Sequence, residues 1–312
     1  MPGKVVGGYR QINKALNICA FEDYLEGQQG SLPKLLDVEQ ISPRVLRVLG
    51  QNAGKFTLQG TNTYIIGTGD KRLIVDTGQG APEWAELISK ELTKGGFTLS
   101  HVLLTHWHGD HTGGVPDLLR MYPEDLSKGI YKHTPGKAQQ PILNGQVFQV
   151  EGATVRAFHA PGHSHDHMCF ILEEEDAMFT GDNILGHGTA AVEHLGTWMA
   201  ALRNMRTTGC KIGYPAHGAV VSDLPAKIDG ELAGKLRRER QVMRALQPTE
   251  THTPRLSVPE LVTAIYGNRV DADLREQALI PFIDEVCRKL AEDGMVGFQI
   301  RSGIKRWFAV SD

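Results

Sequence analysis

The chain has 312 residues, of which 41% are hydrophobic and 22% are charged, and its formal net charge is −3. This length allows one large domain or a large domain with a small one, and the composition is that of a globular protein that buries a core. The small net charge excludes a strong overall basic field of the kind that attracts nucleic acid or a membrane surface. Cys19, Cys169, Cys210 and Cys287 show no CxxC spacing, which indicates free thiols in a reducing compartment.

The N-terminal segment carries no clear targeting signal. No apolar run approaches the roughly 18 residues that a membrane span needs, and the apolar core of a secretory signal is missing. Lys4, Arg10 and Lys14 precede the first acid, Glu22, so a mitochondrial presequence stays open, although the Ser- and Arg-rich character is absent. We therefore expect a cytoplasmic protein without membrane contact.

The first half of the chain alternates strand and helix signals. The segment 63–78 (TYIIGTGDKRLIVDTG) predicts two buried strands joined by a Gly-rich hairpin turn. The segment 82–96 has apolar residues at helical spacing and ends in two glycines, so it predicts a helix. An apolar run at 99–106 leads into a histidine-rich stretch, and the segment 112–122 (TGGVPDLLRMY) predicts another helix.

Further strands are predicted at 146–160, 167–182 and 211–218. Strands mixed with helices indicate a layered α/β domain. A helical pattern over 225–246 leads out of it, and the Pro/Thr-rich segment 247–257 is typical of a linker.

The C-terminal part predicts a helix from Val258, a second helix, and a hairpin that turns at Ser302–Gly303, which is a winged-helix-like pattern. These signals predict a catalytic domain over residues 1–230, with an N-terminal extension over 1–40. They also predict a small helical, winged-helix-like region over 231–312.

The stretch THWHGDHTGG, residues 105–114, gathers His106, His108, Asp110 and His111. Divalent ions of the zinc type bind imidazole and carboxylate ligands at roughly 2.0–2.2 Å. Two histidines that alternate at a strand end can face one point, and the aspartate and histidine beyond them can face a second point where the chain turns into a helix. The glycines of the stretch allow that turn. A solvated, histidine-rich loop is the alternative for this stretch alone.

Four more ligating residues follow short strand-like or turn signals, namely Asp76 in LIVDTG, His163 in APGHSHDH, Asp182 in MFTGD and His217 in YPAHG. Each signal alone is weak, because a single His or Asp at a strand end is commonly solvated. The ordered set is much more specific. It predicts a closed site for two metal ions.

This ordered set resembles the metallo-β-lactamase superfamily. The resemblance implies an αββα sandwich with a dinuclear metal site between two sheets. It implies two divalent ions, with zinc favoured and manganese allowed, since mixed nitrogen and oxygen donors suit both. The implied ligands are His106, His108 and His163 for the first ion, Asp110, His111 and His217 for the second, and Asp182 as the bridge.

The same resemblance implies that Asp76 supports a ligand from behind rather than binding an ion itself. Two cations activate water near neutral pH and stabilise a developing oxyanion. Asp110 would bind an ion and also accept and return the proton of the nucleophile, which makes it the expected catalytic residue. The superfamily acts on lactams, thioesters and phosphodiesters, so the fold does not select the reaction.

Several other polar residues have less specific patterns. His187 and His194 are expected to be structural or to line the substrate site. His165 and His167 flank Asp166, and His167 is expected either to reach the pocket or to have a supporting or surface role. A basic run appears in the 225–246 helix at Lys235, Arg237, Arg238, Arg240 and Arg244. Such a run is usually a solvated face, but it also suits an acidic partner.

Longer segments narrow the resemblance. FTLQGTNTYIIGTGDKRLIVDTG, FTGDNILGHGT and the winged-helix-like tail are similar to the β-lactamase-like branch that includes a mitochondrial endoribonuclease. The segment 7–52 is similar to fungal metallo-β-lactamase-type thioesterases that serve aromatic polyketide synthases without a release domain, of the atrochrysone carboxyl-ACP thioesterase type. A thioesterase acting on a polyketide attached to an acyl carrier protein is therefore the expected function. A metal-dependent endoribonuclease is the alternative.

General chemistry favours the thioesterase. A thiol has a pKa near 8.5, so a thiolate leaves with little help from an acid, whereas the alkoxide of a phosphodiester needs more. An acyl carrier protein is typically acidic and would suit the basic helix, and nucleic acid is not expected as a partner. A non-enzymatic scaffold is disfavoured because both sets of metal ligands are complete.

Overall fold

The computed structural model describes residues 32–250 and 252–310. The described chain forms two compact units, which divide between Ile228 and Asp229. Cys19 and the first part of the segment 7–52 lie outside the described residues.

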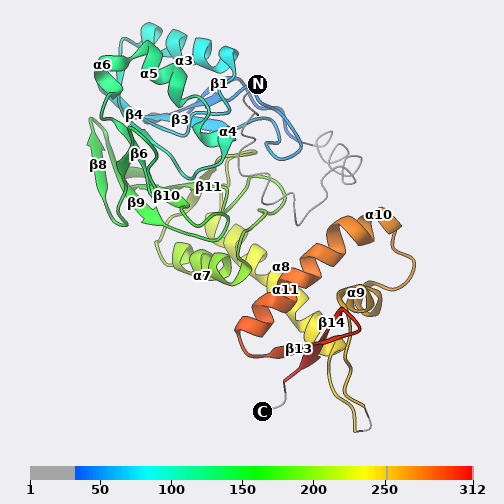
Figure 1. Cartoon of the computed structure of the whole chain (residues 1–312). Helices are drawn as coiled ribbons and strands as arrows, with labels where there is room; N and C mark the ends of the chain where they lie inside the picture. Colours follow the sequence, from blue (N-terminus) through cyan, green and yellow to red (C-terminus); the bar gives the residue numbers. More distant parts are fainter. Residues whose placement is uncertain (1–31, 251, 311–312) are drawn as a thin grey trace. The chain divides into compact units, whose positions relative to one another are not determined.

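The first unit contains two β-sheets (Figure 1). The first sheet has seven strands in the order β1 (Val38–Ser42), β2 (Val45–Leu49), β3 (Asn62–Ile66), β4 (Lys71–Val75), β5 (Thr98–Leu103), β6 (Ile130–Lys132) and β7 (Gln140–Pro141). The second has five strands in the order β12 (Ile212–Pro215), β11 (Ala177–Gly181), β10 (Met168–Leu172), β9 (Ala153–His159) and β8 (Val147–Val150).

In each sheet, the strands that precede the ligating residues end at the same edge. In the first sheet β4 and β5 are parallel. In the second sheet β11 and β12 are parallel, and β9 and β11 run the same way because each is antiparallel to β10. Parallel strands deliver the loops at their carboxyl ends to one edge, where sites in layered α/β proteins are usually built.

The two sheets pack face to face. Their inner side chains form one buried cluster that includes Tyr64 and Val75 of the first sheet and Val155, Phe170 and Phe179 of the second. β3 and β10 are buried along their whole length, and β10 is accordingly apolar throughout, whereas β3 begins with two polar residues, Asn62 and Thr63. The burial of both inner faces stabilises the sandwich.

Helices cover the outer faces (Figure 1). α3 (Pro82–Gly95) turns Trp84, Ile88 and Leu92 into a second apolar cluster with the outer side of the first sheet, and α5 (Val115–Met121) joins it. α7 (Leu195–Arg206) lies on the other side of the second sheet. Helix, sheet, sheet and helix therefore form the expected αββα sandwich.

The helix predicted over 112–122 is wrong in its details. α4 (Gly109–Thr112) starts earlier, and the chain breaks at Gly113 and Gly114 before α5. Gly113 donates a backbone hydrogen bond to the Gly78 carbonyl at 3.0 Å, and a Cβ on Gly114 would lie 2.2 Å from the Thr77 carbonyl oxygen. The break lets the loop after β4 approach the backbone closely.

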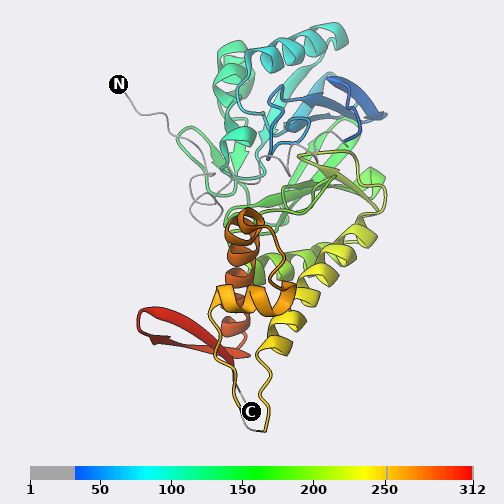
Figure 2. The same ribbon diagram turned by 90° about the vertical axis from the view of Figure 1, so that its right-hand side faces the viewer.

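The second unit contains helices and a hairpin (Figure 2). Its elements are the larger part of α8 (Leu224–Ala245), α9 (Val258–Tyr266), α10 (Ala272–Leu274), the π-helical turn η3 (Arg275–Leu279), α11 (Ile280–Glu292), β13 (Val296–Arg301) and β14 (Ile304–Ala309). Ser257 and Glu260 form a capping box that fixes the start of α9. Leu256 forms an antiparallel bridge with Trp307. The order of helix, helix and hairpin matches the expected winged-helix-like pattern.

Within the described residues, no helix is both long and apolar enough to cross a membrane. Cys169, Cys210 and Cys287 are buried free thiols, as the sequence predicted for these three.

Candidate metal centre

The loops at the sheet edge bring together every ligating residue that the sequence predicted. His106 and His108 follow β5, and Asp110 and His111 lie on α4. Three further residues follow strands of the second sheet, namely His163 in the loop between β9 and β10, Asp182 directly after β11, and His217 shortly after β12. All seven side chains are buried or nearly so.

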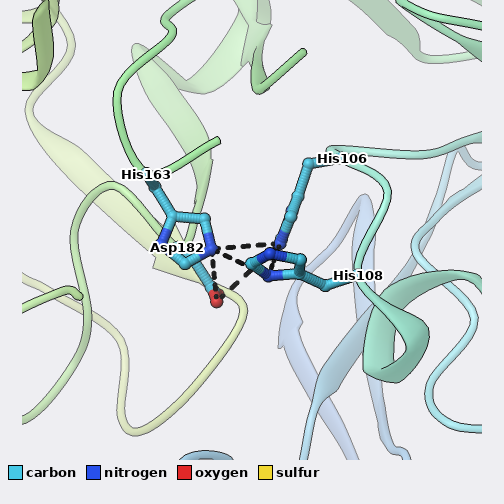
Figure 3. A group of neighbouring side chains, drawn as sticks. All are labelled: His106, His108, His163 and Asp182. Atoms are coloured by element: carbon cyan, nitrogen blue, oxygen red, sulfur yellow. Dashed lines mark hydrogen bonds and ion pairs between the residues drawn. The ribbon is translucent and has the colours of Figure 1, made fainter. Parts of the chain in front are cut away.

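The first group contains His106, His108, His163 and Asp182 (Figure 3). The Nε2 atom of His106 lies 2.9 Å from Nδ1 of His108, and Nε2 of His163 lies 3.2 and 3.1 Å from these two atoms. Oδ2 of Asp182 lies 3.3 Å from Nε2 of His163. Three ring nitrogens therefore converge on one point beside a carboxylate oxygen.

The second group contains Asp110, His111 and His217. Oδ2 of Asp110 lies 3.3 Å from Nε2 of His111 and 3.2 Å from Nε2 of His217. Oδ1 of Asp182 lies 3.5 and 3.3 Å from the same two ring nitrogens. Each carboxylate oxygen of Asp182 thus faces a different group, which is the geometry required of a bridging ligand.

The chemistry of these groups fits metal ions. Nitrogen ligands of a tetrahedral zinc ion lie about 3.3 Å apart, which follows from bond lengths near 2.0–2.1 Å, and the three histidine nitrogens of the first group are close to that spacing. Nε2 of His111, Nε2 of His217 and Oδ1 of Asp182 are buried without a hydrogen bond to any described residue. Buried polar atoms that lack a hydrogen bond are costly, and a cation between these three would be a ligand partner for each of them.

Two histidines of the first group, His106 and His108, are held neutral, which is the form that binds metal. Burial lowers the pKa of His106 well below its ordinary value, and the positive charge that His111 can carry lowers it further. Burial, with His163 as the next cause, lowers the pKa of His108 to about 3.

In the second group the pKa values are shifted towards charged side chains when no metal is present. Burial alone would raise the pKa of Asp110 and Asp182, but the neighbouring histidines, led by His111 for the first and His217 for the second, together hold both pKa values well below their usual range. Burial would lower the pKa of His111, but the surrounding carboxylates, led by Asp110, together raise it well above its ordinary value. Asp182 and Asp110 together likewise overcome burial and raise the pKa of His217 to about 9. Without metal, this group is a set of buried ion pairs.

Asp76 lies behind the site. Its Oδ2 lies 2.8 Å from Nδ1 of His111, and its Oδ1 accepts a hydrogen bond from the Thr105 backbone at 2.8 Å. Asp76 itself has a left-handed backbone, with φ at 59°, which turns the chain sharply after β4. The arrangement directs Nε2 of His111 towards the second group, and His163 is oriented similarly because its Nδ1 lies 2.6 Å from the Ala191 carbonyl.

We expect Asp76→Asn to weaken metal binding by about 10–100-fold, the usual effect of losing a partner behind a ligand. An amide cannot accept hydrogen bonds on both the Thr105 side and the His111 side, because one of its two ends is a donor. A competition titration against a chromophoric chelator measures the affinity. Asp117→Asn, which changes a carboxylate in a surface ion pair with Arg120, is the control. Equal metal affinity in the two variants would contradict the role of Asp76.

His167 has a supporting role that the sequence left open. It is fully buried, and its Nε2 accepts a hydrogen bond from the Asp182 backbone at 3.0 Å. Gly181 has φ at 51°, and a Cβ there would lie 2.4 Å from Nε2 of His167. His167 and this glycine therefore fix the backbone that carries Asp182. His165, in contrast, is exposed and pairs with Glu193.

Sequence reasoning missed a buried ion pair near the site. Nζ of Lys132, at the end of β6, lies 2.7 Å from Oδ2 of Asp166, and Ser164 donates a hydrogen bond to Oδ1 of the same carboxylate at 2.9 Å. Asp166 lies between His163 and His167 in the chain, so this pair holds the loop that delivers both. Lys132 is the last residue of a short strand, and no local sequence pattern marks it as a partner of Asp166.

The two remaining histidines differ. His194 accepts a hydrogen bond from the Thr197 backbone at 3.1 Å and caps α7, which is a structural role. His187 is in neither of the two groups of candidate metal ligands.

A sandwich of two sheets with two such groups at one edge defines a metal-dependent hydrolase fold. A family model described as the metallo-beta-lactamase superfamily matches residues 56–252. The chain belongs to this superfamily, and the resemblance noted from the sequence is confirmed.

Close relatives extend over nearly the whole chain. An atrochrysone carboxyl ACP thioesterase of Cryptosporiopsis sp. (strain 8999) is 68% identical over 99% of this chain and 98% of its own. One of Aspergillus novofumigatus is 69% identical over 96% and 95%, respectively. Among solved structures, a beta-lactamase domain protein from Burkholderia ambifaria matches with a TM-score of 0.69 and 16% identity over 90% of this chain and 95% of that one. That structural likeness supports the fold alone.

Proposed function

We propose that this protein is a metal-dependent thioesterase that releases an aromatic polyketide from the acyl carrier protein of a polyketide synthase lacking its own thioesterase. The observation that carries the proposal is the full-length identity of 67–69% to relatives named as atrochrysone carboxyl ACP thioesterases. The complete set of buried ligating side chains supports an active enzyme rather than an inactive homologue.

We assign the first ion to His106, His108 and His163, and the second to Asp110, His111 and His217. Asp182 is assigned as the bridge, because its two oxygens face different groups. Zinc is favoured over manganese for this mixture of imidazole and carboxylate donors. When bound, the ions supply Lewis acidity, which activates water near neutral pH and polarises the thioester carbonyl.

In this proposal Asp110 acts both as ligand and as proton carrier. It accepts the proton of the attacking water and returns it to the leaving thiolate or to solvent. Asp76 supports His111, and His167 supports Asp182. No covalent acyl-enzyme is needed, and the described cysteines are poor nucleophiles, since burial raises the pKa of Cys169, Cys210 and Cys287, the last to about 12.

Residues 1–230, with their extension 1–40, would form the catalytic domain. The winged-helix-like region 231–312 would assist with the substrate, and the protein would act in the cytoplasm.

Two reactions run in parallel test the function against the endoribonuclease alternative. Purified protein is mixed with a polyketide synthase that lacks a thioesterase domain and, separately, with single-stranded RNA. We expect a free carboxylic acid only when the enzyme is added to the synthase, and no product with Asp110→Ala or His111→Ala. Cleavage of RNA with the same metal dependence, while the loaded carrier stays acylated, would establish the nuclease instead.

A further inference from the structure

The second half of α8 separates its charges by face. In the segment 235–246 the exposed residues are Arg237, Arg240 and Arg244, and all of them are arginine. Their spacing of three and four residues places them along one side of the helix. We call these three residues the arginine stripe.

The other charges of this segment point elsewhere. Lys235 and Glu239 are buried, and Nζ of Lys289 on α11 lies 2.8 Å from Oε1 of Glu239. Arg238 is half-buried, with its guanidinium 5.4 Å from the centre of the Phe282 ring. These residues pack α8 against the rest of its unit. The basic run in the sequence is therefore divided between a packed face and an exposed face.

The arginine stripe has no ion pair with any residue in the described ranges, 32–250 and 252–310. Like charges three and four residues apart on a helix repel one another and destabilise it. The helix dipole offsets part of this cost for Arg244, which lies in the last turn, but its effect does not extend to Arg237. A row of arginines that no described residue neutralises is unfavourable for folding, and a partner that binds it would account for its presence.

We propose that the arginine stripe is the docking surface for the acidic carrier protein that delivers the thioester. This inference rests on the proposed function, because it takes the carrier-bound substrate from there. The guanidinium group is a rigid fork that binds carboxylates and phosphates with two hydrogen bonds. The carrier offers both groups, since its surface is acidic and its prosthetic arm is attached through a phosphodiester.

RNA is the competing occupant of a basic helix face. It is disfavoured because the chain as a whole has a net charge of −3 and the stripe has only three cations. Three phosphate contacts give weak, strongly salt-dependent binding. A carrier protein needs no more than such a small patch, because the acyl chain that it carries contributes binding energy of its own.

The test compares two substrates with the same acyl group, one on the carrier protein and one on a small thiol such as N-acetylcysteamine. In the variant R237Q/R240Q/R244Q we expect KM for the carrier-bound substrate to rise about tenfold, since each exposed ion pair contributes about twofold to threefold. We expect kcat and KM for the small thioester to be unchanged. KM for the carrier-bound substrate should rise with salt in the wild type and much less in the variant.

The matched control R120Q/R269Q/R288Q removes the same charge from exposed arginines elsewhere and should leave both substrates unaffected. Direct titration of the carrier domain against the protein gives Kd even without turnover. A wild type that hydrolyses neither substrate but binds the carrier through the stripe would refute the thioesterase and leave this inference standing. An unchanged Kd and KM in R237Q/R240Q/R244Q would overturn the inference, as would loss of RNA binding without loss of carrier binding.

Discussion

Replacing Asp182 with alanine is expected to lower kcat by more than about 10³-fold and to reduce the bound metal from two equivalents to one or fewer. The loss of a single oxyanion-stabilising group lowers kcat by about 10²–10³-fold. Replacing Asp182 would impair the activation of water as well. The reason is geometric, since one carboxylate oxygen faces the first group at 3.3 Å and the other faces the second group at 3.3 and 3.5 Å. Asp182 belongs to the first group through one oxygen and faces the second group with the other.

Elemental analysis of protein purified without added metal checks this result. His108→Ala is the comparison, because His108 belongs to the first group only. That variant should lose the first ion and nearly all turnover, yet keep the second ion. Near-ultraviolet circular dichroism should show that both variants remain folded. If Asp182→Ala keeps two equivalents and turnover within tenfold of the wild type, the bridging assignment is wrong.

Residues that carry a strong local signal were predictable. The strands predicted over 63–78 are confirmed as β3 and β4, because a run of apolar residues with a Gly-rich turn specifies a buried hairpin through local chemistry. The seven proposed metal ligands also carry their own signal, since His and Asp gather at strand ends in a fixed order. The structure brings these side chains into two groups.

Supporting residues were not predictable, because their roles depend on contacts between distant segments. Lys132 and Asp166 are 34 residues apart and meet only once β6 lies beside the loop after β9. The short strands β6 and β7 have no clear periodicity, and they form because their edges pair with β5 and with each other. The break at Gly113 and Gly114 likewise depends on the loop after β4.

The basic run on α8 shows how a pattern can be ambiguous in sequence and clear in structure. Lys235, Glu239, Val242 and Leu246 form the buried side of the helix, so two charged residues occupy positions that a hydrophobic pattern would give to apolar ones. The inward charges are tolerated because α11 supplies Lys289 as a partner for Glu239. The packing of α11 against α8 decides which charges are buried and which belong to the arginine stripe. This contact between distant segments cannot be read from the sequence of α8 alone.

Stripping the protein with a chelator is expected to abolish turnover and to lower the free energy of unfolding of the metallo-β-lactamase unit. Metal that binds only the folded state stabilises it by about 4 kcal/mol when its free concentration is 1,000 times Kd. Thermal unfolding measured with and without added zinc gives the stability difference. Equal unfolding temperatures and undiminished turnover in the stripped protein would exclude a metal centre.

Rebinding of the two ions is expected to differ in its dependence on pH. In the first group, His106 and His108 bind metal without displacing protons near neutral pH, because both are already neutral, His108 with a pKa of about 3. The second group must release protons, because the pKa of His217 is raised to about 9 and that of His111 is also raised. About two protons should therefore leave at pH 7 as the second ion binds. Its apparent affinity should rise steeply with pH, about tenfold per unit for each proton displaced, and the His217 contribution should level off above pH 9.

Calorimetric titrations with zinc in buffers of different ionisation enthalpy count the released protons. The sign follows from the direction of the shifts, since a group with a raised pKa in the metal-free protein holds its proton until metal or a higher pH removes it. His217→Ala should remove one proton from the count, whereas His108→Ala should leave the pH dependence of the second ion in place. If both ions bound with the same pH dependence, or without proton release at pH 7, the second group could not be the set of buried ion pairs described for the metal-free protein.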